Sequence, residues 1–378
     1  MLFRSKHINP NTAEEDKQQV VVLYDSESER HVICFEDVKR PSGDKDFNDA
    51  IFYATASVDS AVQEEDIAGL PKVWIGAEDS DWFNPNNWNP AAVPDSSDNI
   101  SIAASATYFP VVSGNVSVDA IVVEPGATLT FDESVVAELT GDLTSTSNQV
   151  INGCVKMKGN KKQHIFGDTQ LQELTLETTD SVSVEGNLSV THNLIIESGT
   201  LVTNNKVTLK GSPQKNAFFI EEEDGEVVGN VTAEGMTSSA SGYHYLCTPL
   251  QNQTLSDVMD DITLLSLGGN SSSVPFPNCW IYDETNTSPD KADGWVTPGS
   301  TAHVMGAGSG FALNTPGNAM IDFNGPVNTG TIIKTLTHTV SQGGSVECPP
   351  DGWHLIGNPY PCAIDWSKVI LQIGRAHV

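Results

Sequence analysis

Short runs of alternating apolar and polar residues dominate the chain, and turn-forming residues interrupt them at close intervals. Between Val73 and about residue 231, runs rich in Val, Leu, Ile and Thr are separated by Gly, Asn or Asp. The strands that this pattern predicts include residues 120–123, 128–131, 171–176, 182–184, 194–196 and 207–209. A period of two, without helical periodicity between the runs, predicts an all-β fold.

The turn phrases in this region recur loosely, about every 20 residues. Gly141-Asp142 and Gly186-Asn187 begin two of them. A parallel β-solenoid, similar to a β-helix, produces this pattern because each rung stacks only on its neighbours. An antiparallel sandwich would give nearly the same pattern and is the alternative. In a solenoid, the following apolar side chains should point inward and stack in columns: Val123, Leu129, Leu176, Val184, Leu194, Ile196 and Leu209.

Changes in composition and loop length along the sequence divide the chain into modules. Residues 6–58 contain β-like runs at 20–24, 31–35 and 50–54 and predict part of a β-sandwich module, and residues 59–72 read as an acidic polar linker. The solenoid is expected over residues 73–232. Residues 233–372 carry longer loops and more aromatic residues, which predicts a β-sandwich-like module. Two short helices are expected there, near residues 256–262 and from Asp365 onward.

Charge excludes some classes of partner. The chain has 19 Lys and Arg against 49 Asp and Glu, a formal net charge of −30. Such a chain repels phosphate backbones and anionic membrane surfaces, so nucleic-acid binding is not expected. No apolar run approaches the roughly 20 residues of a membrane-spanning helix, so membrane insertion is not expected either. It should attract cations, above all Ca²⁺, which prefers oxygen ligands.

An acidic loop is the strongest candidate for such a cation. Five carboxylates and one Asn fall within the 14 residues from 36 to 49, and several alternate in position as in a loop that turns oxygen ligands inward. The candidate ligands are Glu36, Asp37, Asp44, Asp46, Asn48 and Asp49. The spacing departs from that of an EF-hand, and a solvated acidic turn is the alternative. We expect Ca²⁺, because the carboxylates would otherwise repel one another.

Three tryptophans within 15 residues form a second candidate. Exposed, Trp82 and Trp88 could stack on sugar rings as in a lectin. The favoured interpretation is that, with Trp74, they cover the open end of the first rungs of the solenoid.

Enzyme interpretations find little support in the sequence. Ser309 lacks the flanking glycines of a nucleophile elbow, and the nine His are scattered singly, without metal-ligand spacing. A pectate-lyase-like solenoid is the enzymatic alternative. The six Cys permit disulfides, of which Cys348–Cys362 and Cys247–Cys279 are the candidate pairs, although small buried thiols are equally compatible with the sequence.

The N-terminal residues resemble a known family. Phe35-Glu36-Asp37, followed by Asp44, Asp46-Phe47-Asn48-Asp49 and a final strand, resembles the C-terminal part of the LruC-type domain of unknown function of large bacterial surface proteins. The resemblance covers about 50 residues and implies a β-sandwich module whose acidic cluster holds calcium.

The rest of the chain resembles secreted surface proteins of the Bacteroidota. The phrases Val73-Trp74-Ile75-Gly76 and Gly126-Ala127-Thr128-Leu129 are similar to those of their solenoid repeats. The series from Gly229 to Trp366, including Gly352-Trp353-His354-Leu355, resembles the module that precedes the sorting domain of type IX secretion. The resemblance implies export to the cell surface by that machinery, through a C-terminal domain that lies beyond this chain.

Both ends of the chain resemble translated sequencing adapters. Residues 373–378 match the translation of a common library adapter, and residues 2–5 match that of its reverse complement. We therefore expect residues 1–5 and 373–378 to be foreign to the natural protein.

Together these patterns predict a non-catalytic, exported protein of the outer cell surface. Its role would be that of an adhesion or display stalk stabilised by calcium, with an unknown surface or glycan ligand. The alternative is a solenoid that binds or cleaves carbohydrate.

Overall fold

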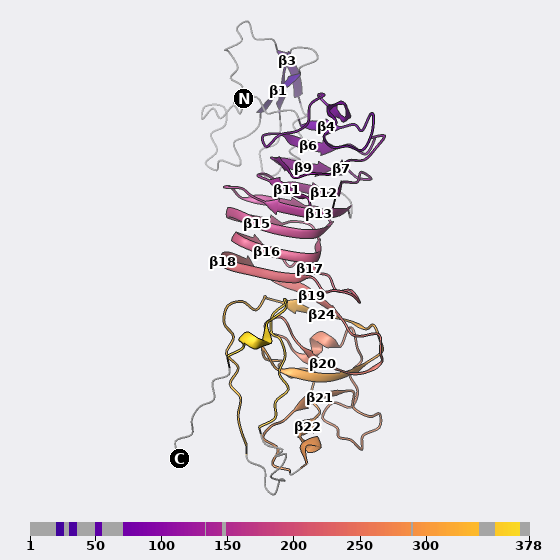
Figure 1. The fold of residues 1–378 in the computed structure, drawn as a ribbon, viewed down its shortest axis with the longest axis vertical. Coiled ribbons are helices and arrows are strands. Elements are labelled where there is room, and N and C mark those ends of the chain that lie inside the picture. Colours follow the sequence, from indigo (N-terminus) through magenta and orange to yellow (C-terminus); the bar gives the residue numbers. More distant parts are fainter. Residues whose placement is uncertain are drawn as a thin grey trace.

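The protein is an elongated, almost entirely β molecule, with 43% of residues in strands and 5% in helices (Figure 1). The computed structural model describes residues 20–25, 30–35, 50–54, 71–132, 134–145, 149–288, 290–339 and 352–370. The predicted all-β class is confirmed. The expected adapter residues at both ends lie outside the described residues. No helix among the described residues is long and apolar enough to cross a membrane.

Three antiparallel strands form the N-terminal sheet, in the order β1 (Val20–Asp25), β2 (Arg30–Phe35) and β3 (Ala50–Ala54). They lie where the three β-like runs predict strands. The register pairs Phe35 with both Val20 and Ala50.

A β-solenoid of about six turns occupies the middle of the molecule. Its first face stacks one short strand from each early turn, all parallel: β4 (Lys72–Trp74), β6 (Asn99–Ile102), β9 (Ala120–Val123), β12 (Leu143–Ser145) and β14 (Gln163–Phe166). β5 (Trp88–Asn89) pairs with β4 from the outside, antiparallel. Along this face the partners Ile100, Ile121, Leu143, Ile165 and Val184 recur roughly every 20 residues, which confirms the predicted period.

Two further faces complete each turn. The second face contains β7 (Val111–Val112), β10 (Thr130–Phe131), the start of β13 (Gln149–Met157), β17 (Val207–Leu209) and β19 (Val231–Met236). The third contains β8 (Val116–Val118), β11 (Val136–Leu139), the end of β13 and the start of β18 (Phe218–Val228).

Two long strands pass through all three faces. β15 (Thr169–Val184) and β16 (Leu188–Val202) pair in parallel, and their register shifts three times along the pairing, at irregularities that let a strand bend. Sequence reasoning predicted separate short strands in this region. The structure joins them because the bends keep the backbone paired.

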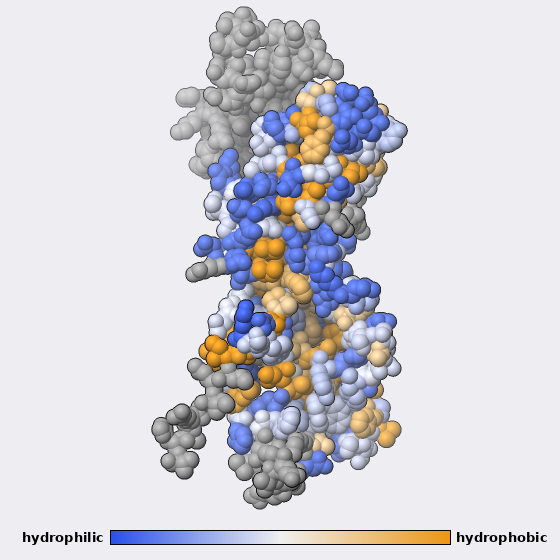
Figure 2. Space-filling model, viewed as in Figure 1, coloured by the Kyte–Doolittle hydropathy of each residue, from blue (hydrophilic) through white to orange (hydrophobic). Residues whose placement is uncertain are grey.

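The core of the solenoid consists of stacked apolar columns. All seven side chains predicted to point inward are buried, with at most 1% of their surface exposed. Burying a Val, Leu or Ile side chain contributes about 1.5–3 kcal/mol, so the columns are a major source of stability. The parallel pairing excludes the antiparallel sandwich for residues 120–210. The face seen in Figure 2 is mainly hydrophilic along the solenoid, with apolar residues in small patches.

The C-terminal module closes the last turn. Its strand β24 (Met320–Gly325) pairs antiparallel with β19, and β19 spans the predicted boundary at residue 232. A four-stranded antiparallel sheet follows, in the order β20 (Gly242–Cys247), β23 (Gly310–Thr315), β21 (Cys279–Tyr282) and β22 (Trp295–Val296).

The predicted helices are both short 3₁₀-helices. η4 (Leu255–Val258) lies at the first predicted position, and η6 (Trp366–Lys368) begins after Asp365. The Ser367 backbone N–H donates to the Asp365 carboxylate over 3.0 Å, so Asp365 caps this helix. Among the described residues, two further 3₁₀-helices are η3 (Pro85–Asn87) and η5 (Lys291–Gly294).

Candidate functional site

The acidic loop predicted to bind calcium lies outside the described residues. Only its ends are described: β2 ends at Phe35, β3 begins at Ala50, and these two residues are direct antiparallel partners. The loop that carries Glu36, Asp46 and the other candidate ligands is therefore closed at its base. Within the described part of the chain, no group of three or more His, Cys, Asp or Glu is arranged to hold a metal ion. Calcium binding at the loop stays a prediction.

The three N-terminal tryptophans are packed against one another in the interior. The ring centroids of Trp82 and Trp88 lie 4.7 Å apart and those of Trp74 and Trp88 5.0 Å apart, both edge to face. At most 1% of each side chain is exposed. The predicted carbohydrate contact at Trp82 and Trp88 is therefore wrong, because neither ring presents a free face. Their place beside β4 and β5 agrees with the interpretation as a cover for the first rung.

A buried asparagine builds the loop that holds these tryptophans. The Asn87 side chain accepts the Glu78 backbone N–H over 2.9 Å and donates to the Asp79 carboxylate over 2.6 Å. Hydrogen bonds, first from Asn87 and then from the Asp81 backbone and Asn84, lower the pKa of Asp79 below its ordinary value. The loop is thus held together by its own side chains, since Asn84 and Asn87 both donate to the Asp79 carboxylate.

The candidate disulfides are not formed among the described cysteines. Cys247 and Cys279 are both free thiols, so the predicted Cys247–Cys279 pair is wrong. Cys362 is also a free thiol, and Cys348 lies outside the described residues. Burial raises the pKa of Cys279 to about 12 and, together with the nearby Glu173 carboxylate, that of Cys154 to about 11. These thiols stay protonated at neutral pH and act as small apolar side chains.

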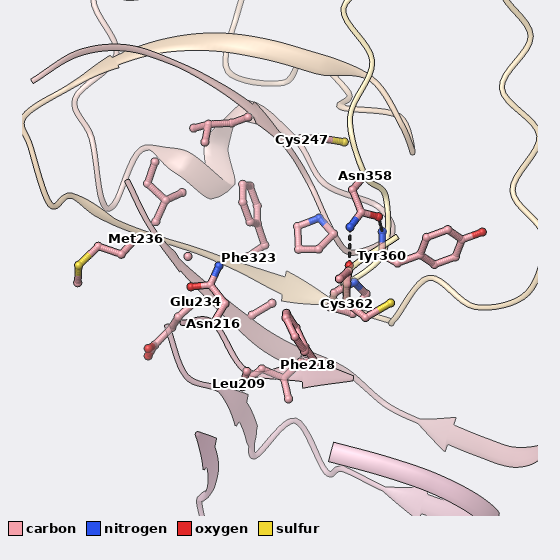
Figure 3. A pocket seen from close by; sticks show the side chains of 18 of the residues that line it. Leu209, Asn216, Phe218, Glu234, Met236, Cys247, Phe323, Asn358, Tyr360 and Cys362 are labelled. Atoms are coloured by element: carbon pink, nitrogen blue, oxygen red, sulfur yellow. Dashed lines mark hydrogen bonds between the residues drawn. The ribbon is translucent and has the colours of Figure 1, made fainter. Parts of the chain in front are cut away.

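A cavity of about 400 Å³ lies where the last turn of the solenoid meets the C-terminal module (Figure 3). Leu209 and Phe218 line it from the solenoid, and Phe323 and Pro361 from the module. The Phe219 backbone N–H donates to the Pro361 carbonyl over 2.9 Å and joins the two parts. The polar Asn358 side chain is occupied by its own loop, as the dashed lines in Figure 3 show. Asn358 is therefore not free to bond a ligand in this cavity.

The remaining candidate is an aromatic groove on the C-terminal sheet, with a volume of about 540 Å³. Five aromatic side chains line it: Tyr243, Tyr245, Phe276, Trp280 and Trp295. Three of them are substantially exposed, namely Tyr245 at 70%, Phe276 at 52% and Tyr243 at 46%. Large aromatic residues are usually mostly buried in a folded protein, so the exposure of three of them in one groove makes this groove the candidate site.

The strand register explains why these rings share one face. Ala312 on β23 is the direct partner of Tyr245 on β20 and of Trp280 on β21. Side chains of directly paired residues point to the same face of a sheet. Tyr243 precedes Tyr245 by two residues and therefore lies on that face as well. Because the Ala312 side chain is small, it does not fill the space between the rings.

The rings form two clusters within the groove. In the first, Tyr245 and Trp295 are stacked with centroids 6.0 Å apart and planes 9° apart, and Tyr282 contacts Trp295 edge to face at 5.3 Å. In the second, the Phe276 and Trp280 centroids lie 5.7 Å apart.

Hydrogen bonds fix the second cluster in place. The Trp280 indole N–H donates to the Tyr243 hydroxyl over 3.1 Å and to the Pro277 carbonyl over 3.2 Å. The Tyr243 hydroxyl donates to the same carbonyl over 3.0 Å. Rings held in this way lose little conformational entropy when a ligand stacks on them.

Sequence reasoning missed this groove. It assigned Tyr243, Tyr245, Trp280 and Trp295 to the structural phrases of a module, because strand sequences alone do not say which face is covered. Aromatic residues at alternate positions, as in Tyr243-His244-Tyr245 and Trp280-Ile281-Tyr282, were the available signal.

The fold is that of an all-β solenoid protein with an exposed aromatic groove on its terminal module. A family model described as "Domain of unknown function (DUF8693)" matches residues 73–152 and 148–373, and the chain belongs to this family. A second model, "Domain of unknown function (DUF4114)", matches residues 1–57. No curated protein and no solved structure matched the chain.

Proposed function

We propose that this chain is part of a non-catalytic protein of the outer cell surface that binds carbohydrate. The solenoid serves as a stalk, and the C-terminal module presents the aromatic groove. Export by the type IX machinery and stabilisation by calcium belong to the same proposal, on the strength of the sequence resemblances. The adhesive role and the carbohydrate-binding alternative thus become one function, at residues other than Trp82 and Trp88.

The observation that carries the proposal is the exposed aromatic groove itself. Sugar rings present a face of C–H groups that packs on an aromatic ring, while their hydroxyls hydrogen-bond around the edge. The stacked pair Tyr245 and Trp295 provides such rings at the surface. Side chains of Asn270, Ser271 and Asp293 line the same groove and provide polar groups.

A glycan array probed with the chain and two variants tests the proposal. We expect Tyr245→Ala to weaken binding at least about tenfold, or 1.4 kcal/mol, because it removes a stacking ring. Tyr108→Ala is the matched control, since Tyr108 is 47% exposed but lies on the solenoid. Equal binding by Tyr245→Ala and the unmodified chain, or no binding to any glycan, would contradict the proposal.

A further inference from the structure

The two aromatic clusters of the groove are separate surfaces on which a ligand can pack. Tyr245 and Trp295 come from β20 and β22, the outer strands of the sheet, whereas Trp280 comes from β21 and Phe276 from the loop before it. Each cluster has one member with more than half of its surface exposed, Tyr245 at 70% and Phe276 at 52%. A single sugar ring can cover one such ring, so a ligand that uses both clusters must be longer.

The size of the groove agrees with a longer ligand. Its volume of about 540 Å³ lies well within the range of about 300–1,000 Å³ typical of ligand sites. The groove also runs between the two clusters over the low Ala312 side chain, which pairs with both Tyr245 and Trp280. A chain of sugars can therefore lie across the sheet.

The charge of the groove selects among glycans. Asp293 is the one ionisable acidic residue that lines it, and no Lys, Arg or His lies among the lining residues. The whole chain adds a formal charge of −30. None of the described side chains that line the groove is a cation, so an acidic sugar would meet repulsion there that a neutral sugar would not.

The rim offers hydrogen bonds suited to hydroxyl groups. The Asn270 side-chain oxygen accepts the Ser272 backbone N–H over 2.8 Å, which orients the amide and leaves its NH₂ group free among the described contacts. One oxygen of Asp293 accepts from the Ser288 hydroxyl over 2.5 Å, which holds this carboxylate in place as an acceptor.

Building on the proposed function, we infer that the groove binds a neutral oligosaccharide chain across at least two adjacent sugar subsites, one on each aromatic cluster. The Tyr245–Trp295 cluster holds one sugar and the Phe276–Trp280 cluster holds another. Asp293 and Asn270 bond hydroxyls at the rim, and uronic acids are excluded by charge.

The test is calorimetric titration with oligosaccharides graded by length. The probes are mono- to hexasaccharides of neutral glucan, mannan, galactan and xylan, together with oligogalacturonates of matched length. In the neutral series that binds, affinity should rise at least about tenfold from the monosaccharide to the tetrasaccharide and then level off. Oligogalacturonates of the same length should bind at least about tenfold more weakly.

Two variants assign the subsites. Tyr245→Ala and Phe276→Ala should each weaken tetrasaccharide binding, and the double variant should abolish it, while Tyr108→Ala leaves it unchanged. Because Tyr245 and Phe276 are both exposed, the variants should unfold at the same temperature as the parent chain. This measurement separates a loss of binding from a loss of folding.

The outcomes separate the inference from the proposed function. A monosaccharide that binds as tightly as a tetrasaccharide overturns the two subsites but leaves sugar binding intact. Equal or tighter binding of oligogalacturonate overturns the preference for neutral chains. Failure of every glycan, or displacement of the ligand by choline as in an aromatic cage for cations, overturns both.

Discussion

Tryptophans at the two ends of this molecule differ in what covers their rings. Trp88 lies between Trp74 and Trp82, and its indole N–H donates to the Trp82 carbonyl over 2.8 Å. Trp295 stacks on Tyr245, whose own ring is 70% exposed. The same type of residue is therefore enclosed by other rings at one position and stacked on an exposed tyrosine at the other.

Removing a buried tryptophan should weaken the first turns of the solenoid. We expect Trp88→Ala to lower the free energy of unfolding by about 3–5 kcal/mol, because it leaves a cavity and removes the contacts with both neighbouring rings. Hydrogen exchange should then show lost protection in β4 and β6 but not in β17 and β19, since each turn contacts mainly its neighbours. Trp366→Ala is the control, because that side chain is 54% exposed. Unchanged protection in β4 would contradict the account.

Gly153 is one of several glycines that have no room for a side chain. A Cβ at Gly153 would lie 2.4 Å from Cβ and from Cδ2 of Phe131 on the neighbouring turn. Gly153→Ala should therefore destabilise the chain by about 1–3 kcal/mol through overpacking. Denaturant unfolding measures the loss, and the substitution should cost less in a Phe131→Ala background. Gly299→Ala should be nearly neutral, because nothing lies within 4 Å of its Cβ position.

Two aspartates at the junction make stability depend on pH. Burial raises the pKa of Asp322 above its ordinary value of 3.8, and the nearby carboxylates of Asp261, Asp260 and Glu234 add to the rise against the opposing charge of Lys210. Burial likewise raises the pKa of Asp261.

The folded state therefore binds a proton more tightly than the unfolded chain at these groups. Their contribution to stability is full at low pH and is lost as the pH rises from 3.8 through the raised values. Asp322→Asn should remove part of this loss and stabilise the chain at pH 7 by up to about 1 kcal/mol, since solvent screens partly exposed charges. Thermal unfolding between pH 3 and pH 8 measures it. If Asp322→Asn is less stable than the parent at pH 7, the cost of ionising Asp322 is not the cause of the pH dependence.

At the scale of the elements, the local sequence pattern predicted the bounds of individual strands but not all of their partners. Strands such as β9 and β17 were predicted at their observed bounds, because alternating apolar residues need a buried face and turn residues end each run. The pairing of β24 with β19 could not be predicted in this way. The two strands are far apart in the sequence, and nothing in either local pattern names its partner.

The N-terminal hairpin allows the calcium prediction to be tested. Because Phe35 and Ala50 pair at the base of the acidic loop, bringing its carboxylates together should require a cation to offset their repulsion. Millimolar Ca²⁺ should raise the unfolding temperature of the N-terminal module, Asp46→Ala should abolish the rise, and Mg²⁺ should serve poorly. Glu222→Ala, an exposed carboxylate on the solenoid, is the control. If calorimetry detects no Ca²⁺ binding by the N-terminal module, the calcium hypothesis is contradicted.

At the scale of the molecule, the solenoid sets the distance between the first rung and the C-terminal module. About six turns, each adding about 4.8 Å, separate the first rung from the C-terminal module by roughly 30 Å. The solenoid itself was predicted from the sequence, because stacked turns repeat a local pattern. It did not find the groove, because Tyr245 and Trp295 meet only when β20 and β22 are assembled around β23 and β21.

A crystal structure of the chain with a bound neutral tetrasaccharide tests the central claim most directly. The account predicts sugar rings in the aromatic groove, one packed on Tyr245 and Trp295 and another on Phe276 and Trp280. Sugar bound along a face of the solenoid, with the groove empty, would contradict it.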